Sequence, residues 1–248
     1  MKRVILVIPA IVALLFAACT TRSPETGYYI GWGVVGSAED PFTINMDNGS
    51  RLIVLTNLVP NFELENDKRV IVDYSIIEQV EAVTPTYNVR VNMLYNVLSK
   101  PLLEQSCINS EENDIDEDSV GYDPIRINRA NFSGVFLNLA FQIKAGNSGV
   151  KHWINLVYDD IERDSDIKGD TAFLRLRHNA FGDPATQWTT EQNASFPLST
   201  IIEPPQTERL IKLIWTDYTG KTYSSPGLFK LNSTADGKSG FFFATLVE

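Results

Sequence analysis

The sequence predicts an all-β protein with an N-terminal OB-like small barrel over residues 27–98 and a C-terminal antiparallel β-sandwich over residues 125–248. Three observations predict this fold class. Apolar and polar residues alternate with a period of two along most of the chain beyond residue 26, as in half-buried strands. No stretch keeps the 3.6-residue period of a helix for three turns. A charged stretch, residues 99–124, separates two groups of strands and is expected to be an acidic linker.

The N-terminus has the pattern of a signal peptide, expected over residues 1–18. A cationic start, Met1-Lys2-Arg3, is followed by the uncharged run Val4–Ala18. A helix of that length rises only about 22 Å, which is short of the roughly 30 Å hydrocarbon core of a bilayer. The run therefore indicates an export signal and not a membrane span.

The export signal ends in Phe16-Ala17-Ala18-Cys19, and small residues before a cysteine are typical of bacterial lipoprotein signals. We therefore expect a lipoprotein signal peptide, cut before Cys19, and lipidation of Cys19. Two or three acyl chains give a stable membrane anchor, at about 0.8 kcal/mol per buried CH₂. Residues 19–26 are expected to be a polar tether. The expected location is the outer membrane, with the periplasmic and cell-surface faces both left open.

The barrel is expected to contain five short strands. The fifth expected strand carries its apolar side chains on one face. Between the second and third expected strands, Asp47-Asn48-Gly49 is typical of a tight hairpin turn. Five short strands in one compact unit fit a small barrel of the OB type. The expected strands are residues 28–36, 42–46, 51–58, 69–77 and 86–98, and the apolar face of the last is Tyr87, Val89, Val91, Met93, Tyr95 and Val97.

The sandwich is expected from six to eight further strands. The linker before them carries Pro101 and the acidic run Glu111–Asp118. Alternation then resumes at Val135–Lys144, and residues 172–178 and 210–217 follow the same pattern. Several short strands with turn signals between them are typical of a β-sandwich.

Composition excludes several classes of function. The chain has 248 residues, with 21 Lys plus Arg against 31 Asp plus Glu, so its net charge is −10. No nucleic-acid partner is expected, because an acidic surface repels phosphate backbones. Two cysteines and two histidines rule out a cysteine-rich metal module, and Asp114, Asp116 and Asp118 lack the glycine and glutamate of a calcium loop. We expect no metal and no cofactor, since no apolar helix follows the dinucleotide-like motif Gly31–Gly36.

No motif points to catalysis. His152 and His178 are the two histidines, neither has a second metal-ligating residue at the right spacing, and the Gly-x-Ser-x-Gly elbow is missing. Counting carboxylates does not exclude a glycosidase, but no spacing favours one. We therefore expect no catalytic residue and no enzyme. Trp188 lies in a polar surround and is the candidate ligand-binding residue, whereas Cys107, the remaining cysteine, is assigned no role.

Four segments resemble the NigD-like lipoprotein family of the Bacteroides group. They are Gly27–Gly33, Phe132–Leu139, His152–Val157 and Leu174–Asp183, and the stretch Arg177-His178-Asn179-Ala180-Phe181-Gly182-Asp183 within the last is the most specific. The resemblance covers nearly the whole mature chain and implies an N-terminal OB-like domain followed by a C-terminal β-sandwich. It also implies a role like bacteriocin immunity, and it supplies no catalytic residues.

The resemblance further implies a modification. Exported proteins of that bacterial group carry O-glycans on serine or threonine that follows aspartate and precedes a small or aliphatic residue. Asp118-Ser119-Val120 and Asp170-Thr171-Ala172 match this pattern, so Ser119 and Thr171 are the expected O-glycosylation sites.

These observations favour a non-catalytic, acyl-anchored cell-envelope lipoprotein that binds a protein partner. The partner is expected to be another envelope protein or a secreted protein such as a toxin, and the membrane is contacted through the acylated Cys19. A glycan-binding surface lipoprotein is the alternative, since OB folds and β-sandwiches both bind oligosaccharides. A hydrolase is the third reading, and fold alone does not choose among the three.

Overall fold

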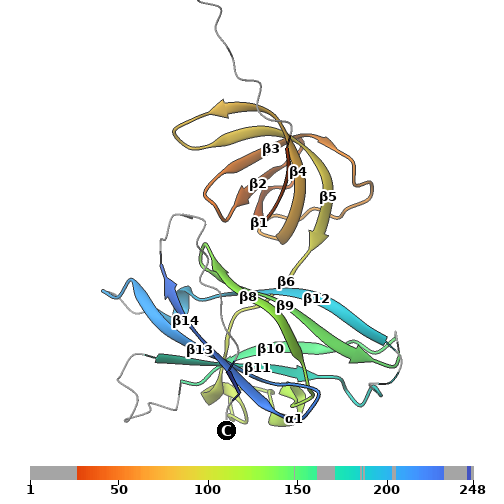
Figure 1. The fold of residues 1–248 in the computed structure, drawn as a ribbon, viewed down its shortest axis with the longest axis vertical. Helices are drawn as coiled ribbons and strands as arrows, with labels where there is room; N and C mark the ends of the chain where they lie inside the picture. Colours follow the sequence, from red (N-terminus) through yellow and green to blue (C-terminus); the bar gives the residue numbers. More distant parts are fainter. Residues whose placement is uncertain are drawn as a thin grey trace, which may run out of the picture.

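The computed structural model describes residues 27–147, 149–160, 171–184, 186, 188–202, 205–231 and 245–246. A five-stranded barrel and a two-sheet sandwich follow one another along the chain (Figure 1), which confirms the all-β fold class. The predicted signal peptide and tether, with Cys19, lie outside the described residues. In the described part of the chain, no helix is long and apolar enough to cross a membrane.

The barrel closes in the strand order β1-β2-β3-β5-β4, with β4 paired back to β1. β3 and β5 run parallel and the other neighbours are antiparallel, as in an OB-type barrel. Aliphatic side chains from alternate strand positions fill the interior. The strands are β1 (Tyr28–Ser37), β2 (Thr43–Met46), β3 (Arg51–Asn57), β4 (Arg69–Glu81) and β5 (Thr86–Asn96).

The glycine motif of the first strand lies inside β1 and not at a strand-to-helix turn. A Cβ atom at Gly33 would lie 2.6 Å from Cγ2 of Ile44 on β2. Glycine is therefore required here because the two strands approach closely, and no nucleotide site needs to be invoked.

The alternation predicted for β5 is wrong beyond its middle. Met93 and Tyr95 lie on the outer face of the barrel, whereas Leu94 is buried. Asp73 of β4 pairs with Met93, but the next residue of β4 pairs with Val91, so β5 contains one extra residue. Such a β-bulge reverses the inward and outward alternation of everything that follows it.

The sandwich has a six-stranded sheet, β15-β14-β13-β11-β10-β7, and a four-stranded sheet, β6-β12-β9-β8. Most neighbours are antiparallel, as predicted, but β11 with β13, β10 with β7 and β12 with β6 are parallel pairs. The strands are β6 (Leu98–Ser99), β7 (Leu103–Glu104), β8 (Arg126–Ser133), β9 (Phe136–Ala145), β10 (Trp153–Tyr158), β11 (Thr171–Asn179), β12 (Trp188–Pro197), β13 (Glu208–Thr216), β14 (Thr222–Lys230) and β15 (Thr245–Leu246).

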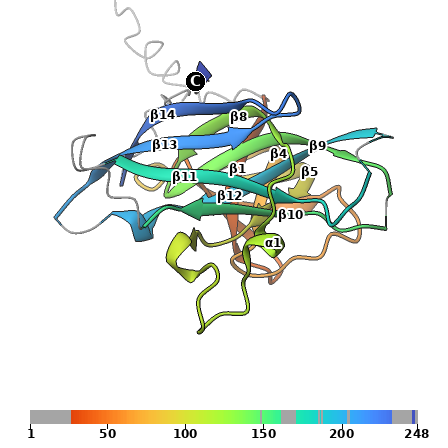
Figure 2. The same cartoon turned by 90° about the horizontal axis from the view of Figure 1, so that it is seen from below.

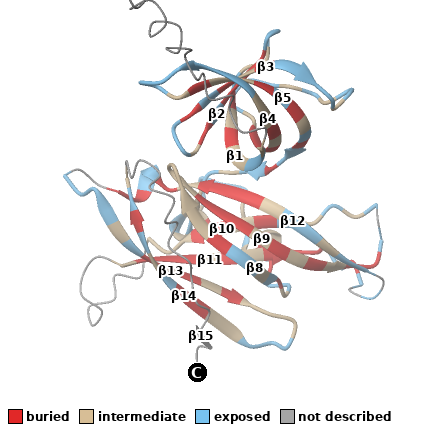
Figure 3. Cartoon of the chain, turned by 45° about the horizontal axis from the view of Figure 1, so that its top comes forward, coloured by how far each residue is buried: buried red, intermediate tan, exposed pale blue. Residues whose placement is uncertain are grey.

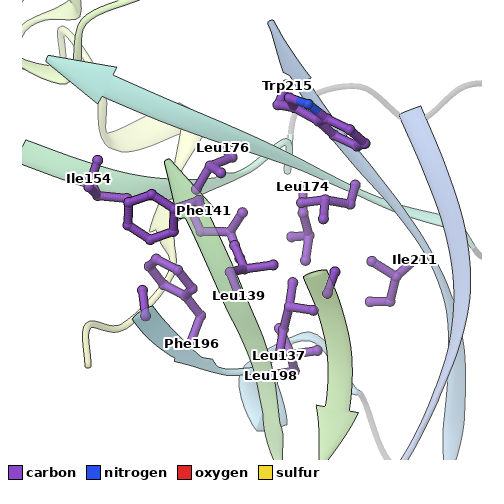
Figure 4. Packing of buried hydrophobic residues seen from close by; sticks show 14 of the residues in the cluster. Leu137, Leu139, Phe141, Ile154, Leu174, Leu176, Phe196, Leu198, Ile211 and Trp215 are labelled. Carbon is purple, nitrogen blue, oxygen red and sulfur yellow. The ribbon is translucent and has the colours of Figure 1, made fainter. Parts of the chain in front are cut away.

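The sandwich core lies between the two sheets. Leu139 and Phe141 of β9 and Phe196 of β12 face Leu174 and Leu176 of β11 (Figure 4), and all five side chains are buried. Figure 3 shows that buried residues occur along the strands of both sheets and of the barrel, between half-buried and exposed ones. Each fully buried leucine or phenylalanine contributes about 2 kcal/mol of hydrophobic stabilisation.

Residues 99–124, for which the sequence predicts an acidic linker, pack along the sandwich. Ile108 and Val120 form a small apolar cluster with Val157 of β10. A short 3₁₀ turn, η1 (Gln105–Cys107), and a short helix, α1 (Glu117–Val120), lie in this segment, and Figure 2 shows α1 beside β10. The side chain of Asp116 caps α1, so part of the acidic run has a local structural role.

Arg69, the first residue of β4, joins the barrel to the sandwich. Its side chain is only 1% exposed and forms a two-pronged ion pair with Asp47 in the turn between β2 and β3. The Nε atom donates to Oγ of Ser195 on β12 at 3.0 Å, and a terminal nitrogen donates to Oδ1 of Asn138 on β9 at 3.0 Å. The guanidinium also lies 4.1 Å from the ring centroid of Phe136.

The partners of this joint are themselves paired. Ser133 donates to Asp47, and Ser195 donates to Asn138. Asn138 and Ser195 are completely buried, although Asn138 falls between the apolar positions of the alternating stretch Val135–Lys144. A buried charge is tolerated only when it is paired and hydrogen-bonded, so this network fixes how the barrel sits on the sandwich.

Candidate functional site

The segment that follows the barrel, residues 98–104, covers part of one side of the sandwich. This chain lies first against β12 as β6 and then against β10 as β7. Between the two, Lys100 donates to the backbone oxygen of Ile154 at 3.1 Å and to Oδ1 of Asn155 at 2.9 Å. Residues 98–104 therefore bridge the edges of the two sheets.

Beyond this bridge, no other strand of the described residues pairs with these two edges. β6 pairs with β12 only at Ala194 and Ser195, which are buried, whereas Trp188–Asn193 of the same strand are exposed or half-buried. Likewise, β7 pairs with β10 only at its last two residues, Val157 and Tyr158. An open strand edge offers unpaired backbone groups to another extended chain.

A cleft of about 450 Å³ lies between these two open edges. This volume falls within the range of small-ligand sites, roughly 300–1,000 Å³. Core side chains of both sheets form its apolar floor, and polar side chains of β12 stand at its rim. The floor includes Phe141, Ile143 and Ile154, and the rim includes Thr190, Gln192 and Asn193.

One exposed tryptophan lines the cleft, and a second begins β10 next to it. Trp188, the candidate ligand-binding residue of the sequence analysis, lines it and is 39% exposed. Trp153 is more exposed, at 45%, because it begins β10 where β7 does not reach. Its ring meets that of Phe181 edge to face with 5.1 Å between centroids, and Nζ of Lys100 lies 5.8 Å from its centroid.

A buried polar chain runs beneath the cleft. Nδ1 of His152 lies 2.9 Å from Nε2 of His178, and the two rings stack with 5.0 Å between centroids. Nε2 of His152 lies 3.0 Å from Oδ2 of Asp183, which also accepts a hydrogen bond from the backbone N–H of Gly146. Nδ1 of His178 lies 3.1 Å from the backbone oxygen of Pro124.

The partners of the two histidines determine which ring nitrogens carry a proton. The carbonyl of Pro124 only accepts, so the proton of His178 is on Nδ1, and its Nε2 accepts from His152. Burial lowers the pKa of His178, which keeps it neutral, and the N–H of Gly146 lowers the pKa of Asp183, which keeps it ionised. Nδ1 of His152 therefore donates to His178, and its Nε2 faces the carboxylate of Asp183.

This arrangement leaves neither histidine available as a general base. All four ring nitrogens of the two histidines are engaged by protein atoms. A base needs a nitrogen within reach of the proton that it removes. In the described ranges, no group of three or more histidine, cysteine, aspartate or glutamate residues is placed to hold a metal ion.

The segment that carries the most specific part of the family resemblance has a structural role. The guanidinium of Arg177 stacks over the ring of Tyr122, 3.3 Å from its centroid. It donates to Oε1 of Glu117 at 2.7 Å and to the backbone oxygen of Gly121 at 2.8 Å. Arg177 thereby holds α1 against the end of β11.

The residues after Arg177 make further hydrogen bonds to the same segment. The side-chain amide of Asn179 donates to the backbone oxygens of Asp118 at 2.7 Å and Ser119 at 3.0 Å. The N–H of Ala180 donates to Oδ2 of Asp123 at 2.7 Å, and the next two residues turn the chain with φ values of 50° and 73°. The motif therefore holds residues 117–124 in place and positions the histidine chain.

The remaining residues singled out in the sequence lie apart from the cleft. Ser119 is half-buried in α1 and donates to the backbone oxygen of Asp116 at 2.8 Å, and Thr171 is half-buried at the start of β11. Both remain predicted O-glycosylation sites. Cys107 is a half-buried free thiol at the end of η1, and Cys19 lies outside the described residues.

Sequence reasoning missed both buried polar networks. His152 and His178 meet because β10 and β11 pair Ile154 with His178, which makes the two histidines diagonal neighbours. His178 lies at the end of the expected strand 172–178, but the length of the connection between the two histidines left the strand register free. Arg69 carried no signal, since it begins an apolar strand like many surface arginines.

Comparison with known proteins agrees with the C-terminal architecture. A sequence model of the NigD-like C-terminal beta sandwich domain matches residues 106–226. The match begins inside the segment 99–124, in keeping with its packing against the sandwich. No curated protein matches the chain.

Solved structures share the fold of both domains. A protein of unknown function from Bacteroides vulgatus is 23% identical with a TM-score of 0.65, covering 87% of this chain and 96% of that chain. A NigD-like immunity protein from Bacteroides caccae is 17% identical with a TM-score of 0.58, covering 91% and 99%. A candidate lipoprotein from Bacteroides fragilis is 13% identical with a TM-score of 0.56, covering 84% and 99%. The chain thus carries a NigD-like C-terminal beta sandwich domain behind an OB-like barrel, and the resemblance to NigD-like proteins is confirmed.

Proposed function

We propose that this protein is an acyl-anchored envelope lipoprotein that binds another protein at the open side of the sandwich and catalyses no reaction. The observation that carries the proposal is the cleft of about 450 Å³ beside the unpaired edge of β12. An extended segment of a partner would lie along Trp188–Asn193, in line with β6, and place an apolar side chain on the cleft floor.

The anchor and the partner class rest on separate support. The cysteine of the lipoprotein signal, Cys19, would carry the acyl chains, and a structural relative is described as a candidate lipoprotein. Another relative is described as an immunity protein, so we propose a secreted toxin or an envelope protein as partner. The engaged ring nitrogens of His152 and His178 support a role without catalysis.

The site is tested by crosslinking in living cells. A photo-reactive phenylalanine analogue replaces Gln192, exposed at the cleft rim, or Thr219, exposed in the turn between β13 and β14 as the matched control. We expect one discrete protein adduct at position 192, its loss in the Trp188→Ala variant, and no such adduct at position 219. Equal adducts at both positions, or none at 192, would contradict this site.

A glycan ligand is the second candidate, and one observation favours it. Thr190, Gln192 and Asn193 place hydroxyl and amide groups at the rim beside Trp188, a combination that suits a sugar ring. Titration calorimetry with envelope and host oligosaccharides tests it. Oligosaccharide binding that is lost in Trp188→Ala would show that the ligand of the cleft is a glycan and not a protein.

A further inference from the structure

The end of the barrel farthest from the sandwich carries a cluster of exposed apolar side chains. β4 starts at the joint with Arg69 and runs for 13 residues to the hairpin that leads into β5. Val83, in that hairpin, is 92% exposed, and Tyr28, which begins β1, is 77% exposed. We define the distal end by four exposed apolar residues, Tyr28, Ile77, Val80 and Val83.

Strand pairing places these residues at one end. Tyr28 pairs with Ser75 of β4, six positions along the strand from Arg69. Ile77 and Val80 lie farther along β4 than Ser75, and Val83 follows in the hairpin. Exposed apolar patches of this kind are rare on soluble monomers and mark surfaces that contact something else.

The chain outside the described residues ends at the same place. β1 runs from Tyr28 at the distal end toward the joint, where Val34 pairs with Arg69. The predicted tether, residues 19–26, spans at most about 28 Å when fully extended. An acyl chain on Cys19 would therefore hold the distal end close to the bilayer, at a high effective concentration, so weak surface affinity suffices for contact.

We propose that the distal end of the barrel rests on the bilayer that holds the acyl chains, with its four exposed apolar side chains in the headgroup region. Aliphatic side chains and tyrosine are stabilised in that region. The inference rests on the proposed acylation of Cys19. Because the Arg69 joint fixes the two domains, the sandwich and its cleft are then held away from the membrane, where a partner reaches them.

Lipid-attached quenchers test this contact in the full-length acylated protein. Cys107 is replaced by serine, and a single cysteine at Val83 or, as control, at Thr219 carries an environment-sensitive fluorophore. The protein is reconstituted into phosphatidylcholine vesicles containing spin-labelled lipid. We expect blue-shifted, quenched emission at position 83 and unshifted, unquenched emission at position 219.

A second variant checks that the apolar side chains cause the contact. Val80→Asp in the position-83 background is expected to shift the ratio of docked to undocked barrel about tenfold, which reduces quenching. Leu228→Asp, a matched change at an exposed residue of β14, should leave quenching unchanged.

Intact mass separates failure of the contact from failure of the anchor. Emission at position 83 equal to that at 219, in protein whose Cys19 carries acyl chains by mass, overturns the inference alone. The same holds if Val80→Asp leaves the quenching unchanged. A chain without acyl mass overturns the proposed anchor, and with it the inference.

Discussion

Two buried polar networks interrupt the apolar interior, and they differ in the group at their centre. Arg69 joins two domains through Asp47, Asn138 and Ser195. His152 and His178 join two neighbouring strands to loops within the sandwich. A guanidinium stays charged at every accessible pH, whereas an imidazole titrates near neutrality. The domain joint therefore keeps its central positive charge, whereas the support beneath the cleft has titratable imidazoles at its centre.

The largest effect is expected from breaking the joint. Arg69→Met leaves Asp47, whose side chain is 11% exposed, without its counter-ion and removes donors from Asn138 and Ser195. Loss of one partner of a buried ion pair costs about 4 kcal/mol. Urea unfolding measures the loss. Arg69→Lys, which keeps the charge but not the planar fork, should lose less, and a cost below about 1 kcal/mol for methionine would show that the joint is not stabilising.

A smaller effect is expected from breaking the histidine chain. His152→Ala removes the donor from Nε2 of His178 and one of the two donors from Oδ2 of Asp183, both of which are buried. Unpaired buried groups cost about 3 kcal/mol here. The same urea series measures it. A double variant with Arg69→Met should show additive losses, because the two networks share no residue, and strong non-additivity would show that they are coupled.

The pH dependence separates the two networks directly. Burial, followed by the charge of His152, lowers the pKa of His178 below 6.5, while its bond to Pro124 and the charge of Asp123 oppose the shift. The unfolded chain therefore takes up this proton first, so stability is fully present above about pH 6.5 and falls as the pH drops through the lower folded pKa. We expect the slope of unfolding free energy between about pH 7.5 and about pH 5 to flatten in His178→Asn and to persist in Arg69→Met.

Asp183 contributes in a different window. Its pKa lies below 3.8, chiefly because of the Gly146 N–H, so its contribution is lost only as the pH falls below that value. If the unfolding free energy of His178→Asn still depends on pH near neutrality, a group other than His178 causes that dependence.

The smallest effect on stability is expected at the cleft. Trp188 is 39% exposed, so Trp188→Ala should change the unfolding free energy by less than about 1 kcal/mol while abolishing the proposed partner crosslink. A large loss of stability would instead make Trp188 part of the framework. Comparing the stability and the crosslinking of this variant therefore distinguishes a binding role of Trp188 from a structural one.

The sequence predicted strand faces well where alternation was uninterrupted. Val70, Val72 and Tyr74 of β4 are buried together, as period-two patterning indicated. Met93 and Tyr95 were placed on the wrong face because one extra residue in β5 reverses the alternation, and a bulge leaves no composition signal. The residues of the family motif, Arg177–Asp183, were recognisable in the sequence. Their structural role was not, because it depends on contacts with residues 117–124.

By itself, the sequence determined the all-β class, the order of barrel and sandwich and the sides of most strands, because alternating burial is written residue by residue into the chain. Only the tertiary structure decided which distant residues meet. Arg69 meets Asn138 and Ser195, and His152 meets His178, through strand registers that hydrophobic patterning does not constrain. The cleft likewise exists because β6 and β7 stop short of covering both edges, and that depends on how residues 98–104 cross the sandwich.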